Sequence, residues 1–508
     1  MKKVSRKDSI TPLDQEIILP EYCHQTNGIP VALVFPNTYK VGMASLGFLT
    51  VFRFLIDAGF NPERFFLDVR DSKDRPVSVE SGKHLGEFDL IGFHFSFELD
   101  FVNAVKMLIN AGIEPIREKR KKQQIAFSGG IASSANPLPL VDFLDAVFIG
   151  EIDENILKHL KNGIEAEFSF DETFRDFFLS ETYLDKGESS YSSSFHIDPD
   201  WCDKESFSPI LTSRGAFGSM NLIEISSGCP IKCKFCLNGS IYPKVRERKT
   251  DLVLKSASRY KSETAKIGLI GAIPSAHSQI DEILDSLSSS GYKTSLSSLS
   301  VSSMNNPLLD RIVKGGMKTL TLGVECFDEK VQRAYGKVIR MDKLLNSVEY
   351  ALKAGVREIK IYLMLGLPGS DEKEVESIID NVLIIRDRIQ KAKPGTGFTI
   401  SLNPFIPKIA TVYERERFMG ERSFKEGMNR IKKSIAKYGI RIKSESYKSA
   451  YLQYLLSNSD ERIGCVILQL AKGLKRPDYP EIMIVDSDRY ISRSQDKIKH
   501  VVDRKIMS

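Results

Sequence analysis

Short apolar runs alternate with amphipathic stretches over the first third of the chain. Apolar runs that stop at glycine, proline or polar residues are typical of buried strands, and apolar residues repeating every three to four positions are typical of helices. The predicted strands are residues 29–35, 88–95, 125–128 and 146–149, and the predicted helices are residues 43–58 and 99–110. This alternation predicts an α/β domain with a mainly parallel sheet and helices on both of its faces.

Glycines and polar residues stand where these predicted strands end. The carboxyl ends of parallel strands meet at one edge of a sheet, and ligands bind in the crevice outside that edge. Glycine at such positions lets a flat or bulky ligand approach the backbone. The candidate ligand contacts at this edge are Ser96, Gly129, Gly130, Gly150 and Glu151.

Six further predicted strands alternate with helical patterns over residues 211–408. These strands are residues 221–225, 267–271, 293–297, 319–323, 359–365 and 398–402. Six strands joined by helices fit a partial (β/α)6 barrel of the TIM type that is open at one side. Active-site residues of such barrels lie where the strands end.

Between and after these two regions the pattern is weaker. Residues 165–210 lose periodicity and are interpreted as a linker that wraps around the domains. Residues 409–508 predict a mostly helical C-terminal domain that caps the open side of the barrel, with helical patterns at 424–438, 449–456 and 462–474. Residues 1–164 are then expected to be a Rossmann-like domain.

Composition narrows the class of protein. The chain has 508 residues, of which 42% are hydrophobic and 27% charged, and this length predicts about three domains. No apolar run is long enough to span a membrane, and the charged start lacks a signal-peptide core, so we expect a cytoplasmic protein. The net charge of +6 is spread along the chain. The densest basic run, residues 117–122, is interpreted as a solvated turn, and a nucleic-acid partner is therefore not expected.

Three of the seven cysteines are clustered, and they carry the strongest chemical signal. Cys229, Cys233 and Cys236 have the spacing CxxxCxxC on a loop that follows a predicted strand, while the other four cysteines are scattered. A structural zinc needs four protein ligands, and no fourth cysteine or histidine is near in sequence. A 4Fe–4S cluster held by three thiolates would leave one iron open to a cofactor or substrate. An inert cluster or a zinc knuckle is the alternative.

The cysteine spacing, with Phe235 just before the last cysteine, resembles that of the radical S-adenosylmethionine (SAM) superfamily. The resemblance implies that the open iron chelates the methionine moiety of SAM. Electron transfer from the cluster then cleaves a carbon–sulfur bond and yields a 5'-deoxyadenosyl radical. It also implies an electron donor of the flavodoxin or ferredoxin type.

The same resemblance implies contacts to SAM at the barrel strand ends. Gly268 and Gly271 stand where the family often has Gly-Gly-Glu, so only backbone contacts are expected there, and Ser298 ends the third strand. Glu325 ends the fourth strand and corresponds to the family's SAM-binding carboxylate, with a salt bridge to a lysine as the alternative. The fifth strand and the Pro-rich exit of the sixth supply the remaining candidates, Tyr362, Leu363, Gly366 and Asn403.

The N-terminal strand ends resemble the cobalamin-binding domain of one large subclass of the superfamily. The matching pieces are residues 35–39, Gly129-Gly130, Asn136-Pro137 and Gly150-Glu151. The motif Asp-x-His-x-x-Gly, which supplies the lower cobalt ligand in many cobalamin proteins, is absent, and neither His84 nor His94 stands in it. The alternative is a Rossmann-like domain that only packs against the barrel.

Together these resemblances imply a cobalamin-dependent radical SAM enzyme that methylates an unactivated carbon. Its substrate is expected to be a protein side chain, as in the enzyme that C-methylates a glutamine of methyl-coenzyme M reductase, or a small molecule. The first alternative is a radical enzyme without methyl transfer, catalysing a rearrangement, cyclisation or sulfur insertion. The second is a non-catalytic iron–sulfur or zinc protein that binds nucleic acid. No sequence motif identifies catalytic residues beyond the cofactor contacts, and Cys326 and Cys465 are predicted to be core thiols.

Overall fold

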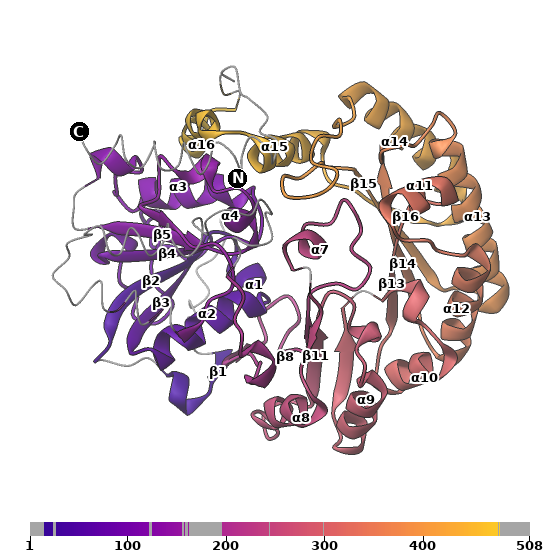
Figure 1. Cartoon of the computed structure of the whole chain (residues 1–508), viewed down its shortest axis with the longest axis horizontal. Helices are drawn as coiled ribbons and strands as arrows, with labels where there is room; N and C mark the ends of the chain where they lie inside the picture. The colour runs from indigo at the N-terminus through magenta and orange to yellow at the C-terminus, as the bar shows by residue number, and fades with distance from the viewer. Residues whose placement is uncertain are drawn as a thin grey trace.

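The computed structural model describes residues 15–23, 27–120, 124–154, 157, 161, 196–242, 244–297, 299–475 and 477. Most of the predicted linker and the candidate Ser298 lie outside the described residues. Figure 1 shows two α/β units side by side, with the N-terminal unit in indigo and magenta and the barrel unit in pink and orange.

The N-terminal unit is a five-stranded parallel sheet, as the alternating pattern predicted. Its strands are β2 (Ile29–Phe35), β3 (Phe60–Phe66), β4 (Leu90–His94), β5 (Ile125–Gly129) and β6 (Ala146–Val147), in the order β3-β2-β4-β5-β6. The helices are α1 (Tyr39–Gly42), α2 (Leu46–Asp57), α3 (Asp100–Asn110) and α4 (Ile131–Ala135). Apolar residues of β2 alternate between two cores. Val31 and Leu33 pack with α2, and Ala32 and Val34 pack with α3, so one helix covers each face.

The edge strand β3 was not predicted, because its sequence interrupts the apolar pattern with charges. All seven of its residues are buried, including Glu63 and Arg64. The Arg64 guanidinium lies 2.6 Å from Glu16 Oε2 and 2.5 Å from Glu80 Oε1, so its buried charge is paired. A buried charge is tolerated only with such partners, and neither partner is adjacent in sequence.

The barrel unit contains all six predicted strands. They are β8 (Asn221–Glu224), β11 (Lys266–Ile270), β12 (Lys293–Leu296), β13 (Thr319–Glu325), β14 (Glu358–Leu365) and β15 (Gly397–Pro404). Every pairing among them is parallel, and a single parallel bridge between Leu299 and Leu322 links the first three strands to the rest. A seventh parallel strand, β16 (Arg441–Lys443), adds to β15 and was not predicted. The sheet is therefore an open, partial barrel.

Helices cover the outside of this partial barrel. They are α8 (Thr250–Ser258), α9 (Ile280–Ser289), α10 (Asn306–Lys314), α12 (Met341–Ala354), α13 (Glu374–Ala392) and α14 (Glu421–Ile435) (Figure 1). Helix α11 (Glu329–Tyr335) instead packs with the cysteine loop, because its buried residues share a core with Cys233. The short helix α7 (Leu237–Ile241) follows the cysteine loop, and the two-stranded pairs β1 (Glu16–Ile18) with β7 (Ile210–Thr212) and β9 (Ser226–Ser227) with β10 (Arg246–Glu247) complete the strands. The outward residues of β13 to β15 and the inward residues of the helices share one apolar core.

The C-terminal segment reaches back to the N-terminal unit. Helix α15 (Tyr447–Asn458) is followed by α16 (Gly464–Ala471), which packs against α3. Leu456 and Val466 belong to the same apolar core as α3, and Asn136 Nδ2 donates to the Ser457 carbonyl oxygen at 3.0 Å. The expectation that this whole segment caps the barrel is therefore wrong for α16, because its apolar face is buried on the N-terminal sheet unit.

Two smaller expectations are also corrected. Arg120, in the basic run interpreted as a solvated turn, is buried and donates to Asp145 Oδ2 at 2.9 Å and to backbone carbonyl oxygens. Cys465 is exposed, whereas Cys326 is buried as predicted. No helix among the described residues is both long and apolar enough to cross a membrane.

Candidate functional site

A cavity of about 730 Å³ lies between the carboxyl edge of the N-terminal sheet and the first strands of the barrel. The volume falls within the range of cofactor and small-molecule sites. Among the predicted contacts, the cavity is lined by Ser96, Gly129, Gly130, Gly150, Glu151, Cys229, Cys236 and Gly271. Residues predicted to bind cobalamin and residues predicted to bind the cluster and SAM thus line the same cavity.

The cysteine loop enters this cavity from β8. Gly228, just before Cys229, has φ +79°, and a Cβ there would lie 2.2 Å from the Lys244 carbonyl oxygen, so only glycine fits. Farther along, the Lys234 amide donates to the Tyr335 carbonyl oxygen at 3.0 Å, and the Lys234 carbonyl oxygen accepts from the Tyr413 amide at 3.3 Å. The end of α11 and the segment after β15 therefore both hold the loop in place.

The three thiols are gathered in apolar surroundings. Cys229 and Cys233 are buried and Cys236 is half-buried. Burial raises the pKa of Cys233 to about 12, against a lowering influence of Lys337, while Cys236, Glu325 and Cys229 raise it further. Burial also raises the pKa of Cys236. The three thiols stand on one short loop, and a bound cation would favour their thiolate forms.

The donor set fits an iron–sulfur cluster chemically. Within the described part of the chain, no three His, Cys, Asp or Glu side chains are already closed into a metal-binding group. Holding a cluster therefore requires the three thiols on this loop to turn towards a common centre. Soft thiolates in a site shielded from water are the ligands of 4Fe–4S clusters.

Glu325 borders the cysteine loop at the end of β13. It has φ +69° at a register shift in the strand, an unusual conformation for a residue with a side chain. Its Oε1 lies 3.2 Å from Lys337 Nζ, which also donates to the Gly323 carbonyl oxygen at 2.6 Å. The salt bridge considered as the alternative thus forms, and the same carboxylate acts electrostatically on Cys233.

The predicted SAM contacts on or next to β14 and β15 lie outside the lining of this cavity. Tyr362 accepts from Lys360 Nζ at 3.0 Å, while Leu363 faces the apolar core under the helices. The Gly366 amide donates to the Glu374 carboxylate at 3.0 Å, and Asn403 Oδ1 accepts from the Glu445 amide at 2.9 Å. The Gly366 amide and the Asn403 side-chain oxygen are thus already hydrogen-bonded within the protein.

Gly268, inside β11, and Gly271, just after it, differ in their surroundings. Gly271 lines the cavity, and a Cβ there would lie 2.3 Å from Ser226 Oγ. Gly268 is inside the strand, where a Cβ would lie 2.7 Å from Leu222 Cδ2, so its small size serves close packing. Of the two glycines, only Gly271 is therefore placed to make the predicted backbone contact with a ligand in the cavity.

The end of the predicted linker supplies part of the cavity wall, which the sequence analysis missed. Trp201 lines the cavity, and the Arg248 guanidinium carbon lies 3.5 Å from its ring centroid. Glu151 pairs with Arg246 through both oxygens and also accepts from the Asp198 amide at 2.9 Å. Trp201 is the chain's single tryptophan, and this was the one signal in the sequence that could have marked the segment.

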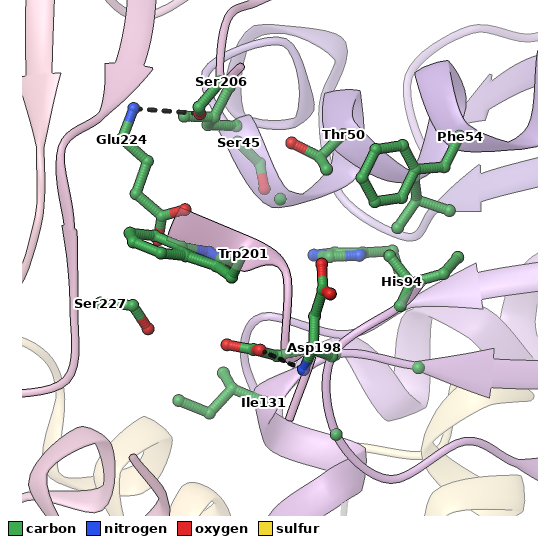
Figure 2. Close-up of a pocket in the computed structure, with 18 of the residues that line it drawn as sticks. Ser45, Thr50, Phe54, His94, Ile131, Asp198, Trp201, Ser206, Glu224 and Ser227 are labelled. Atoms are coloured by element: carbon green, nitrogen blue, oxygen red, sulfur yellow. Dashed lines mark hydrogen bonds between the residues drawn. The ribbon is translucent and has the colours of Figure 1, made fainter. Parts of the chain in front are cut away.

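His94 also lines the cavity, at the last position of β4 (Figure 2). Its ring stacks on Phe35 with centroids 5.9 Å apart and meets the Phe48 ring edge at 6.0 Å. Burial lowers the pKa of His94 to about 4, so the imidazole is neutral at neutral pH. The sequence analysis had noted this histidine only as lying outside the usual cobalt-ligand motif.

The chain was compared with known proteins by sequence and by fold. Residues 223–382 match the Radical SAM superfamily, and residues 53–181 match the N-terminal region of radical SAM proteins. Over 475 residues the chain is 29% identical to the uncharacterized protein MJ0966 of Methanocaldococcus jannaschii, covering 92% of this chain and 97% of that protein.

The fold is similar to that of the radical SAM methyltransferase TsrM from Kitasatospora setae. With tryptophan and a SAM analogue bound, TsrM matches with a TM-score of 0.52 and 12% identity, covering 76% of this chain and 75% of that one. A second TsrM structure, with cobalamin and a 4Fe–4S cluster bound, matches with a TM-score of 0.49 and 14% identity over 74% of this chain and 75% of that one. At this identity the first similarity supports the fold alone.

Proposed function

Because residues 223–382 place this chain in the radical SAM superfamily, we propose that it is a cobalamin-dependent radical SAM methyltransferase acting on an unactivated carbon. An unactivated C–H group offers neither an acidic proton nor a lone pair, so polar methyl transfer to it is not available. The cofactors supply hydrogen abstraction by a 5'-deoxyadenosyl radical and a methyl group carried on cobalt.

The observation that carries the proposal is the shared cavity. Cys229 and Cys236 line it on the barrel side, and Gly129, Gly130 and His94 line it on the side of the N-terminal sheet. A methyl donor and a radical generator have to reach the same substrate carbon, so their sites must open into a common space. A domain that only packed against the barrel would not require this cavity.

Each part of the chain then has a role. Cys229, Cys233 and Cys236 would hold the 4Fe–4S cluster. Glu325, held by Lys337 beside the cysteine loop, would accept hydrogen bonds from SAM. The glycines at the ends of β5 and after β6 would let a flat corrin ring approach the backbone.

The similarity of fold supports this assignment of cofactors without identifying the substrate. TsrM, a radical SAM methyltransferase solved with a SAM analogue bound, has a similar fold over 76% of this chain and 75% of that one. A second TsrM structure contains cobalamin and a 4Fe–4S cluster. The substrate of the present protein is proposed to be a protein side chain or a small molecule, and a flavodoxin or ferredoxin is proposed as the electron donor.

Anaerobic reconstitution tests the proposal. We expect the purified protein to bind iron and sulfide, to bind a corrinoid in a one-to-one ratio, and to release 5'-deoxyadenosine from SAM upon reduction. Cys233→Ala should abolish the cluster and the release, whereas Cys465→Ala, at an exposed cysteine far from the loop in sequence, should leave both intact. Release of 5'-deoxyadenosine without corrinoid binding would instead favour a radical enzyme without methyl transfer. The absence of both corrinoid binding and 5'-deoxyadenosine release would overturn the proposal.

A further inference from the structure

We infer that His94 is the nitrogen ligand that the protein presents to cobalt in a corrinoid bound within the cavity. The inference rests on the proposed function and adds to it the residue that meets the metal. The sequence gave no indication of this role, because His94 lies at the end of β4 and outside any Asp-x-His-x-x-Gly motif.

The position of His94 is the first support. Strands β2 and β4 are neighbours in the sheet, although β3 lies between them in sequence, so their ends form the topological switch point where doubly wound sheets bind ligands. His94 pairs with Gly129 in the register of β4 and β5. The imidazole therefore stands beside a stretch of backbone without side chains, at the centre of the edge.

The glycines next to it form a floor that a flat ring can approach. Gly130 has φ +106°, and a Cβ there would lie 2.5 Å from the Phe95 carbonyl oxygen. Gly150 has φ +123°, and its Cβ would lie 2.4 Å from the His196 carbonyl oxygen. Both positions exclude side chains, so the backbone itself forms part of the cavity wall near the imidazole.

The ring of His94 is held rigidly and has space on one side. Phe35 and Phe48 fix its plane through ring contacts. Gly47, in the first turn of α2, lies beside the ring and also lines the cavity. A Cβ at this position would be in ordinary van der Waals contact with the ring, 3.4 Å from Cε1 and 3.6 Å from Nε2 of His94, so glycine leaves this space beside the imidazole unfilled.

The nitrogens of His94 lack polar partners among the described residues. His277, by contrast, uses both ring nitrogens, Nε2 with the Arg248 carbonyl oxygen at 3.0 Å and Nδ1 with the Gln279 amide at 3.0 Å. His196 is paired with Asp153 at 2.6 Å. His94 is half-buried and lines the cavity.

An unpartnered, ring-stacked imidazole facing a cavity suits a metal. Imidazole nitrogen is the commonest protein ligand of transition metals, and His94 would donate the lone pair of one ring nitrogen to a bound cobalt with no change in the oxidation state of the metal. Figure 2 shows His94 and Trp201 projecting into the same space from different segments. A corrin ring bound in the cavity would thus lie between His94 of the N-terminal unit and Trp201 of the segment before β7.

The test uses the full chain loaded anaerobically with cobinamide, a corrinoid that has no nucleotide base of its own. After reduction to cobalt(II), electron paramagnetic resonance should show nitrogen hyperfine splitting as a triplet in protein with natural histidine. The splitting should become a doublet when histidine is labelled with nitrogen-15. His94→Ala should still bind cobinamide but lose the splitting, and free imidazole should restore it.

Controls separate this inference from the proposed function. His84→Ala changes a histidine that does not line the cavity and should retain the triplet, and His94→Gln provides a second variant if the alanine variant fails to fold. Cobinamide bound to the wild type without nitrogen splitting would overturn the assignment of His94 and leave the proposed function standing. Failure of the wild type to bind any corrinoid would overturn the proposed function together with this inference.

Discussion

Lys408 Nζ lies 2.5 Å from Glu98 Oε1, joining the exit of the sixth barrel strand to the loop after β4 of the N-terminal sheet. The Glu98 carboxylate is only 4% exposed and also accepts from Gln453 of α15 at 3.0 Å. Three segments far apart in sequence thus meet at one carboxylate. This junction is one of the contacts that connect the N-terminal unit with the barrel and its C-terminal extension.

Lys408→Met should therefore destabilise the protein by about 3 kcal/mol, because it leaves a buried carboxylate without its cation. Urea-induced unfolding followed by circular dichroism measures the change. Lys391→Met removes a comparable pair with Asp387 in which both side chains are mostly exposed, and it should cost less than about 1 kcal/mol. Equal effects of the two substitutions would contradict a structural role for the junction.

The same substitution should alter the dependence of stability on pH. Burial by itself raises the pKa of Glu98, but Lys408 and Gln453 outweigh it and hold the pKa below the ordinary value of 4.5. In the wild type the ionised pair therefore stabilises the fold above this value, and the contribution is lost as the pH falls through the lower pKa of the folded state. Without Lys408, burial becomes the dominant influence on the pKa of Glu98 and raises it. Ionisation of the Glu98 carboxyl group then opposes folding.

The difference in unfolding free energy between wild type and Lys408→Met should consequently be larger at about pH 7 than at about pH 4. Unfolding curves at both values measure it, with Lys391→Met as the reference. A difference that stays constant across this range would show that lost packing of the lysine stem, and not its charge, accounts for the destabilisation.

Glu325→Gln should weaken SAM binding about tenfold, the loss expected when a charged hydrogen-bond acceptor becomes neutral. Equilibrium dialysis with the reconstituted protein measures the affinity. Glu349→Gln is the matched control, since Glu349 pairs with Lys353 and Arg388 on the outer surface of the barrel and should bind SAM normally. If Glu325 served only its salt bridge with Lys337, SAM affinity would be unchanged and only stability would fall.

Gly228→Ala should reduce iron retention strongly. A Cβ at this position would lie 2.2 Å from the Lys244 carbonyl oxygen, so the backbone leading into Cys229 must shift. Gly218→Ala is the matched control, because Gly218 also has positive φ, +65°, but a Cβ there meets nothing within 4 Å. The control should cost only about 1 kcal/mol of backbone strain and should keep its iron. Iron and sulfide assays after anaerobic reconstitution distinguish the two outcomes.

Trp201 should report corrinoid binding through its fluorescence. It is the single tryptophan of the chain and lines the cavity, and corrinoids absorb in the region where tryptophan emits. Titration with cobinamide should therefore give saturable quenching with an end point of one corrinoid per chain. S-adenosylhomocysteine, which does not absorb there, provides the control for nonspecific effects. Weak quenching without saturation would argue against a corrinoid in this cavity.

The comparison between sequence and structure is clearest in the strands. β2, β4 and β5 are apolar runs, and β13 and β14 alternate apolar with polar residues, so local patterning was sufficient to predict them. β3 was missed because Arg64 and Glu63 look like surface residues until Glu16 and Glu80 are brought beside them. β16 was missed because it is a short, mostly exposed edge strand with two basic residues.

The sequence by itself determined the cysteine loop, the alternation of strands and helices, and the glycines at the strand ends, because each of these depends on residues close together in the chain. The tertiary structure decided which of them share a cavity, the pairing of Glu325 with Lys337, and the positions of His94 and Trp201 in the cavity wall. Periodicity encodes only which face of an element is buried. Contacts between elements separated by a hundred or more residues, such as Glu98 with Lys408, form only when the two units pack together.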